Sequence, residues 1–201
     1  MKRLGIYGGT FSPPHLGHVL AAEAFLRKVE LDRLLIIPTA IPPHKNAEDV
    51  PSDEHRLALC HLAFDGISGA VVSDLELRRG GKSYTYLTLR ELEMPDQRIF
   101  FLCGTDMLLS LDTWKNAEEV MRRACFTVIA REQDQAIMDA MQRKKEELSK
   151  RFDADIRILD VPPHPASSTE IRKAIADHKS IRGLVPDAVD EYIRKWNLYG
   201  I

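Results

Sequence analysis

The chain has 201 residues, of which 44% are hydrophobic and 29% are charged, and its formal net charge is −2. This length fits one domain over 1–201 with a substantial core, and the balanced charge argues against general nucleic-acid binding, for which a strongly basic surface is typical. No apolar run approaches the roughly 20 residues that span a bilayer, and the N-terminus lacks the pattern of a signal peptide. We therefore expect a cytoplasmic protein with small-molecule ligands and no membrane partner, while its oligomeric state stays open.

The first segments predict a parallel α/β arrangement. Apolar residues from Lys2 to Tyr7 indicate a strand, and helical periodicity follows from Gly17 to about Val29. The continuous apolar run inside Arg33 to Pro38 is typical of a parallel strand that is covered on both faces. We therefore expect a Rossmann-like, open and mainly parallel sheet with helices on both faces, and ligands beyond the carboxyl ends of its strands.

A glycine- and histidine-containing stretch joins this strand to this helix: Gly8-Gly9-Thr10-Phe11-Ser12-Pro13-Pro14-His15-Leu16-Gly17-His18. Glycines let the backbone approach a ligand closely, and the N–H groups that open a helix attract phosphate. His15 and His18 are three residues apart, so both can point at the same phosphate chain. A plain turn and a metal site are the alternatives, but no nearby Cys, Asp or Glu completes a metal-binding set.

The later elements are predicted from their hydrophobic patterns. Helices are expected over 53–64, 83–93, 116–123, 133–151 and 187–196, and strands over 70–77, 99–103, 125–130 and 156–161. Between the second strand and the helix at 53, the polar and proline-rich loop 39–52 contains Lys45, whose flexible charge suits phosphates above the strand ends. An ordinary surface loop is the alternative. The three cysteines lie in apolar contexts, so we expect buried, reduced thiols.

Further polar residues are predicted at the strand ends. Gly104 and Asp106 follow the most apolar strand, where they suit ribose hydroxyls or a metal-bound phosphate, although Asp106 would also serve as a helix cap. Tyr84 and Thr85 open a helix whose N–H groups suit a small anion, with packing of the aromatic side chains in the core as the alternative. Trp114 has polar neighbours and offers a flat face to a heteroaromatic ring, with surface packing as the alternative.

A hydroxyl-rich stretch precedes the last helices: Ser167-Ser168-Thr169-Glu170-Ile171-Arg172. Its hydroxyls suit a helix cap with N–H groups near its entrance, and Arg172 lies about one turn inside, where it could reach the same anion. Ordinary capping and an exposed arginine are the alternatives. We expect 165–201 to be a small helical C-terminal part that carries this second phosphate motif.

These stretches together resemble a known superfamily. The sequence from His15 to His18 is similar to the signature of the nucleotidylyltransferases, and that from Ser167 to Arg172 to their later phosphate motif. Three further stretches resemble the bacterial nicotinate-nucleotide adenylyltransferases: Pro42-Pro43-His44-Lys45, Ser83-Tyr84-Thr85-Tyr86-Leu87-Thr88-Leu89, and Gly104-Thr105-Asp106 with Trp114. One departure is Ser12, where many relatives carry Asp or Asn; its hydroxyl can still bond to the loop backbone, so we expect an altered strength of the loop rather than a loss of function.

The resemblance implies transfer of the adenylyl group of ATP to nicotinate mononucleotide, a step of NAD biosynthesis that releases pyrophosphate. The acceptor phosphate is largely ionised at neutral pH, because its second pKa is about 6, so no general base is needed. Mg²⁺ would bridge the triphosphate oxygens, with Asp106 as the possible side-chain ligand. The implied catalytic residues are His18 and His15. The implied ATP-binding residues are Gly8, Gly9, Thr10, His15, His18, Gly104, Asp106, Ser168, Thr169 and Arg172, and the implied acceptor-binding residues are Lys45, Tyr84, Thr85 and Trp114.

Two other functions stay open on the sequence alone. Another adenylyltransferase, such as one acting on phosphopantetheine, would share both phosphate motifs, but Trp114 and the stretch 83–85 speak against it. A nucleotide-binding regulatory protein without catalysis is disfavoured by the intact pair of His15 and His18.

Overall fold

The computed structural model describes residues 1–40, 50–130, 134–162 and 164–200. Within these residues, six parallel strands form one sheet in the order β3-β2-β1-β4-β5-β6. The strands are β1 (Lys2–Gly9), β2 (Arg33–Pro38), β3 (Ala70–Val72), β4 (Gln97–Gly104), β5 (Ala124–Ile129) and β6 (Ile156–Leu159). This confirms the predicted Rossmann-like fold. The strand order reverses between β1 and β4, which is where open α/β sheets hold their ligands.

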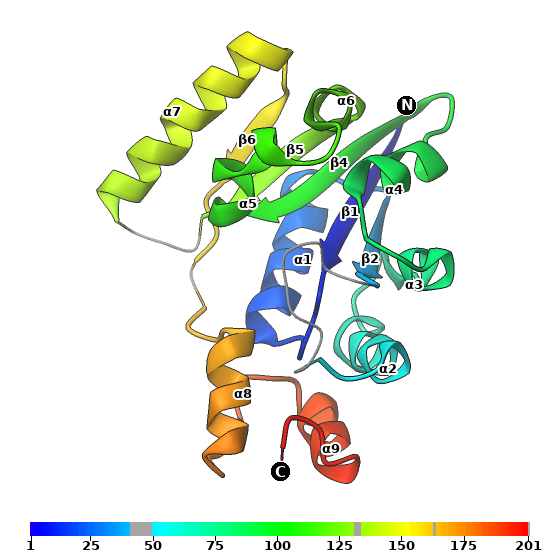
Figure 1. Cartoon of the computed structure of the whole chain (residues 1–201), viewed down its shortest axis with the longest axis vertical. Helices are drawn as coiled ribbons and strands as arrows, with labels where there is room; N and C mark the ends of the chain where they lie inside the picture. The colour runs from blue at the N-terminus through cyan, green and yellow to red at the C-terminus, as the bar shows by residue number, and fades with distance from the viewer. Residues whose placement is uncertain (41–49, 131–133, 163, 201) are drawn as a thin grey trace.

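Helices cover both faces of the sheet. They are α1 (Leu16–Lys28), α2 (Asp53–Phe64), α3 (Leu75–Arg79), α4 (Thr85–Leu92), α5 (Thr105–Leu109), α6 (Ala117–Arg123), α7 (Gln135–Phe152), α8 (Ser168–Ala176) and α9 (Asp187–Lys195), with a 3-10 turn η2 (Leu111–Thr113). One core cluster joins α1, α2, α8 and α9 to one face, and a second joins α4 to α7 to the other. Figure 1 shows α8 and α9 at one end of the molecule, near α2 and the start of α1, with α7 along the edge beside β6.

The sequence pattern explains why β2 lies inside the sheet. Leu34 and Ile36 belong to the core cluster on one face, whereas Leu35 and Ile37 belong to the cluster on the other. All four are buried, as a parallel strand with helices on both sides requires. The cysteines Cys60, Cys103 and Cys125 are also buried with free thiols, as predicted. No helix in the described part of the chain is both long and apolar enough to cross a bilayer.

The strand predicted over 70–77 is wrong in its second half. β3 ends at Val72, and a short helix, α3, follows with Asp74 at its N-cap and Gly80 after its last residue at a φ of 67°. Alternating leucines suggested an extended strand, but the side chain of Glu76 is buried and bonded to Thr88 of α4. This long-range polar contact favours a helical turn, and it has no counterpart in the local hydrophobic pattern.

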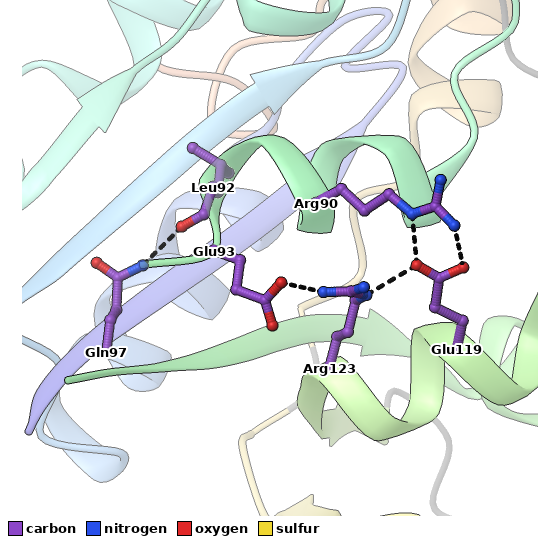
Figure 2. A network of polar contacts seen from close by, with 6 residues as sticks. All are labelled: Arg90, Leu92, Glu93, Gln97, Glu119 and Arg123. Carbon is purple, nitrogen blue, oxygen red and sulfur yellow. Dashed lines mark hydrogen bonds and ion pairs between the residues drawn. The ribbon is translucent and has the colours of Figure 1, made fainter. Parts of the chain in front are cut away.

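An ion-pair network ties α4 to α6 (Figure 2). Glu119 accepts hydrogen bonds from Nε and Nη2 of Arg90 at 2.6 and 2.8 Å and from Nε of Arg123 at 2.8 Å. Arg123 also pairs with Glu93 at the end of α4. The side chain of Glu119 is 22% exposed, and its bonds from Arg90 hold the pKa of its carboxyl below the usual value. The network fixes α4 against α6 on one face of the sheet.

We predict that Glu119→Gln lowers the urea midpoint of unfolding at pH 7 and has a smaller effect in acid. A carboxyl whose pKa is lower in the folded than in the unfolded state stabilises the fold. This stabilisation is complete when the pH is above the unfolded pKa of about 4.3, and it is lost as the pH falls through the lower pKa of the folded state. The difference in urea midpoint between wild type and Glu119→Gln therefore becomes smaller from pH 7 to pH 3. Glu118→Gln is the control, because both partners of the pair between Glu118 and Arg122 are more than 60% exposed. An equal gap at both pH values would contradict the ionic explanation.

Candidate functional site

The chain crosses the carboxyl edge of the sheet directly after β1. Gly8 and Gly9 are the last residues of β1, and α1 begins at Leu16 with His15 as its N-cap. Between them, Phe11 has a φ of 46°, in the left-handed region. We call residues 10–15 the β1–α1 loop. It brings the start of α1 to the edge where ligands of such sheets bind.

The two predicted histidines form a pair at the start of α1. Their ring centroids are 3.7 Å apart, with His15 buried and His18 half-buried. The backbone N–H of His15 donates to Nδ1 of His18 at 3.2 Å. Since Nδ1 accepts, the proton of the neutral His18 ring lies on Nε2, which becomes a hydrogen-bond donor. A Cβ on Gly17 would lie 3.0 Å from the ring of His15, so this close packing favours glycine there.

Aromatic side chains fix the ring of His18. Phe11 makes edge-to-face contacts with His18, Tyr7 and Phe64 at centroid distances of 5.2, 5.3 and 5.5 Å. Such pairs favour defined ring angles. The apolar side of the β1–α1 loop therefore holds the imidazole in place.

The second motif packs directly on the first. Ser167 is the N-cap of α8, and its Oγ accepts from the N–H of Glu170 at 3.2 Å. The hydroxyl of Ser168 donates to the carbonyl of Pro13 at 2.9 Å, and Nη1 of Arg172 donates to the carbonyl of Ser12 at 2.7 Å. The two stretches thus form one site, although they are more than 150 residues apart.

Arg172 also bonds to its own motif. Its Nη2 donates to Oγ1 of Thr169 at 3.3 Å. The guanidinium therefore lies between the start of α8 and the β1–α1 loop, where it is an organised cation rather than an ordinary exposed arginine.

The hydroxyl of Ser12 bonds to the C-terminal segment, whereas we expected it to bond to the loop backbone. Its Oγ lies 3.3 Å from the hydroxyl of Tyr199, and Ser12 is only 3% exposed. Burial raises the pKa of Tyr199 to about 12, so the phenol stays protonated at neutral pH. The partner lies 187 positions away along the chain, and no local pattern identifies it.

The strand-end residues Gly104 and Asp106 lie at the carboxyl end of β4. Gly104 is the N-cap of α5, which starts at Thr105, two residues earlier than a helix capped by Asp106 would. Asp106 is therefore not the cap, and its side chain is exposed in the first turn. In the described residues, no group of three or more His, Cys, Asp and Glu side chains could hold a metal ion. A cation here would need oxygens from a ligand in addition to Asp106.

The start of α4 lies at the same edge. Tyr84 is the N-cap of α4 and Thr85 its first residue, as predicted. Directly before them, Oγ of Ser83 accepts from the N–H of Ala40 at 2.9 Å, which ties α4 to the end of β2. Lys45, with the rest of its stretch 42–45, lies outside the described residues.

Trp114 follows η2 and is half-buried. Its ring contacts Phe101 and Phe126 edge to face at centroid distances of 6.1 and 6.2 Å. Part of the indole thus packs on the core cluster beneath α4 to α7, which the polar flanking residues did not suggest. The remaining surface is open.

Sequence reasoning missed two residues near this edge. His164 lines a narrow pocket with Gly17, Leu20 and Ile129, and its Nδ1 accepts from the N–H of Ala166 at 3.2 Å. Arg56 of α2 is buried and bonds to the β1–α1 loop. The proline-flanked histidine is a weak signal for the first, and an arginine within an apolar helix face is a weak signal for the second.

Comparison with known proteins agrees with this geometry. The model of the cytidylyltransferase-like family matches residues 6–174. The probable nicotinate-nucleotide adenylyltransferase of Desulfatibacillum aliphaticivorans is 36% identical, over 98% of this chain and 99% of that protein. The probable nicotinate-nucleotide adenylyltransferase of Oceanobacillus iheyensis is 37% identical, over 100% of this chain and 98% of that protein. Among solved structures, Plasmodium falciparum nicotinic acid mononucleotide adenylyltransferase complexed with NaAD has a TM-score of 0.77 at 20% identity, over 99% of this chain and 98% of that chain, which supports the fold.

We predict that Tyr199→Phe lowers the free energy of unfolding by about 1 kcal/mol at pH 7, because the buried hydroxyl of Ser12 loses its partner. The phenol binds its proton more tightly in the folded state, with a pKa of about 12 against about 10 when unfolded. The contribution of the phenol to the free energy of unfolding is therefore complete below about pH 10, and it falls as the pH rises further. Urea unfolding of both proteins between pH 7 and pH 11 measures this; a gap that stays constant above pH 10 would contradict it.

Proposed function

We propose that this chain, which belongs to the cytidylyltransferase-like family and within it to the nicotinate-nucleotide adenylyltransferases, transfers the adenylyl group of ATP to nicotinate mononucleotide. The products are nicotinate adenine dinucleotide and pyrophosphate, and the reaction is a step of NAD biosynthesis. The observation that carries the proposal is the pair of imidazoles, with rings 3.7 Å apart, at the start of a helix beside a second phosphate motif.

ATP occupies the edge formed by the β1–α1 loop and the starts of α1 and α8. Its phosphates lie against the backbone N–H groups of residues 8–10, the histidine pair, and Arg172 with the hydroxyls of α8, where helix dipoles and free N–H groups favour negative charge. The adenine ring lies over the mouth of the narrow pocket lined by Leu20, Ile129 and His164, whose mixture of apolar walls and an imidazole suits a flat heteroaromatic base. Since this site draws on residues from Gly8 to Tyr199, we treat 1–201 as one nucleotidylyltransferase domain, in which 165–201 supplies the second motif.

In the reaction, a phosphate oxygen of nicotinate mononucleotide attacks the α-phosphorus of ATP. The new bond joins that oxygen to phosphorus, and the bond to the bridging oxygen of the β-phosphate breaks, so pyrophosphate leaves with the electron pair. The attacking oxygen is already ionised, and no proton has to be removed. Nε2–H of His18 donates to the phosphoryl oxygens as charge builds up on them, because Nδ1 is held by the backbone of His15. Arg172 stabilises the charge on the pyrophosphate side.

A divalent cation fits this site only as a metal carried by the triphosphate. The exposed carboxylate of Asp106 at the end of β4 is the described side chain that would contact it, and Mg²⁺, which prefers phosphate, water and one or two carboxylates, matches this donor set. When bound, Mg²⁺ supplies charge neutralisation on the phosphates.

The acceptor lies between α4 and Trp114. The nicotinate carboxylate faces the N–H groups and hydroxyl at Tyr84 and Thr85, where a helix start favours an anion. The pyridine ring stacks on the open part of the indole of Trp114. The network of Arg90, Glu119 and Arg123 holds α4 and α6 together, which keeps both sides of this acceptor site in place. A contact of Lys45 with phosphate stays a prediction from the sequence.

We predict that His18→Ala lowers kcat about a hundredfold or more, because the loss of one preorganised donor to a developing oxyanion costs roughly 3 to 4 kcal/mol. The affinity for ATP changes much less, since other groups hold the phosphates. Steady-state kinetics of pyrophosphate release measures this, with His61→Ala as the control, because His61 is an exposed residue of α2 paired with Asp65. A loss below fivefold would show that His18 is not catalytic.

We also predict that nicotinate mononucleotide exceeds nicotinamide mononucleotide by at least tenfold in kcat/KM. The amide would place its NH₂ group against N–H donors, and buried donors left unpaired cost roughly 1 to 3 kcal/mol. Trp114→Ala lowers both values by removing the stacking surface. Parallel initial-rate assays with ATP and several acceptors, phosphopantetheine included, measure this. Equal use of both pyridine nucleotides would refute the acid specificity alone. Turnover with phosphopantetheine only, or a lack of turnover with every acceptor tested, would refute the proposed function.

A further inference from the structure

Among the residues that the structure describes, Arg56 is the largest that the fold buries almost completely. It belongs to α2 and is 1% exposed. Its Nη1 donates to the carbonyl of Thr10 at 3.2 Å, its Nη2 donates to the carbonyl of Ala40 at 3.3 Å, and Nη2 also pairs with the carboxylate of Asp53. A guanidinium removed from water needs such partners, because an unpaired buried charge is strongly destabilising.

The two carbonyls belong to the two sides of the proposed reaction site. Thr10 follows β1 and leads into the loop that carries the histidine pair. Ala40 follows β2, which is the neighbouring strand in the sheet. The N–H of Ala40 donates to Ser83, directly before the start of α4. One planar guanidinium therefore connects the ATP side of the edge to the acceptor side.

The bond to Thr10 also sets the direction of a backbone donor. The peptide between Thr10 and Phe11 is trans, since in the described chain the cis bond is the one between Ser12 and Pro13. In a trans peptide, the carbonyl and the following N–H point in opposite directions. With the carbonyl of Thr10 drawn to Arg56, the N–H of Phe11 points away from α2. Phe11 has a φ of 46°, a conformation that non-glycine residues hold only when neighbouring contacts impose it.

We infer that Arg56 is a positioning residue for adenylyl transfer: it fixes the carbonyls of Thr10 and Ala40 and thereby aligns ATP with the acceptor. The inference rests on the proposed function. It assigns Arg56 no contact with substrate; the residue acts through the β1–α1 loop and through Ala40, directly after β2. Alignment of reacting groups governs the rate of such a transfer, and a displacement of about 1 Å costs on the order of a hundredfold.

The test compares Arg56→Lys with wild type. Lysine keeps the positive charge but has one nitrogen, which cannot reach both carbonyls as a planar fork does. We expect kcat to fall at least tenfold, while KM for ATP and KM for nicotinate mononucleotide each change less than threefold. A role in stability alone would lower the melting temperature and leave kcat unchanged at temperatures where the variant is folded.

The matched control is Arg3→Met, at the opposite end of β1. The guanidinium of Arg3 lies 4.8 Å from the ring of Phe100 and has no part in the site. This variant loses thermal stability because the cation over the ring is removed, and its kcat stays within twofold of wild type. Asp53→Asn provides a milder change, because the carboxylate of Asp53 is about half exposed and its removal leaves Arg56 in place. We expect an intermediate loss of kcat, so the inference is testable even when Arg56→Lys folds poorly.

Ser83→Ala tests the connection through Ala40. Arg56 and Ser83 hold the two sides of the same residue, so the effects of Arg56→Lys and Ser83→Ala on kcat are expected to be non-additive by at least threefold in a double-mutant cycle. The effects of Arg3→Met and Ser83→Ala on kcat, in contrast, are expected to be independent, so that the fold-change of the double variant equals the product of the two single fold-changes.

Hydrogen exchange of the peptide covering 8–12, measured by mass spectrometry without substrates, separates this inference from the proposed function. We expect faster exchange there in Arg56→Lys and no change in Arg3→Met. When wild type produces pyrophosphate but Arg56→Lys retains kcat within twofold, the inference is wrong and the proposed function stands. When wild type releases no pyrophosphate with any acceptor, the proposed function is wrong. Hydrogen exchange at 8–12 that is the same in Arg56→Lys as in wild type would overturn the positioning role.

Discussion

Hydrogen bonds to the backbone carbonyls of the β1–α1 loop determine the shape of this site. Arg56 holds the carbonyl of Thr10, Arg172 that of Ser12, and the hydroxyl of Ser168 that of Pro13. These donors come from α2 and α8, which pack on the same face of the sheet. Because the carbonyl dipoles are satisfied by protein groups, negative oxygens do not face the place where phosphates are proposed to bind.

The two faces of the sheet contribute differently to the site. The face covered by α1, α2, α8 and α9 carries the imidazoles and the second motif, and the face covered by α4 to α7 carries Thr85 and Trp114. Both meet at the carboxyl edge, where the strand order reverses. Proposed donor and acceptor sites are therefore built on separate layers, and the residues that bridge the layers, such as Arg56 through Ala40, control how the sites are aligned.

Local patterns in the sequence were sufficient for the sheet, most helices and the position of the histidine pair. Apolar runs predict buried parallel strands, and Gly8 to His18 predicts strand, loop and helix, because both signals lie within one segment. The helix α3 was missed because buried Glu76 depends on Thr88, twelve residues later. Likewise, Arg56 and Tyr199 act through partners 46 and 187 positions away, and sequence periodicity does not encode such pairings.

The contact between Ser12 and Tyr199 has a consequence for the order of events during synthesis. Ser12 is made well before Tyr199 and the helices α8 and α9, which come more than 150 residues later in the chain. The central strand β1 likewise waits for β4, whose pairing residues lie about 95 positions later. Contacts of such long sequence separation form late in folding, because much chain entropy is lost before they are made. The β1–α1 loop is thus expected to reach its final shape late, and a growing chain completes the proposed nucleotide site only after α8 and α9 have left the ribosome.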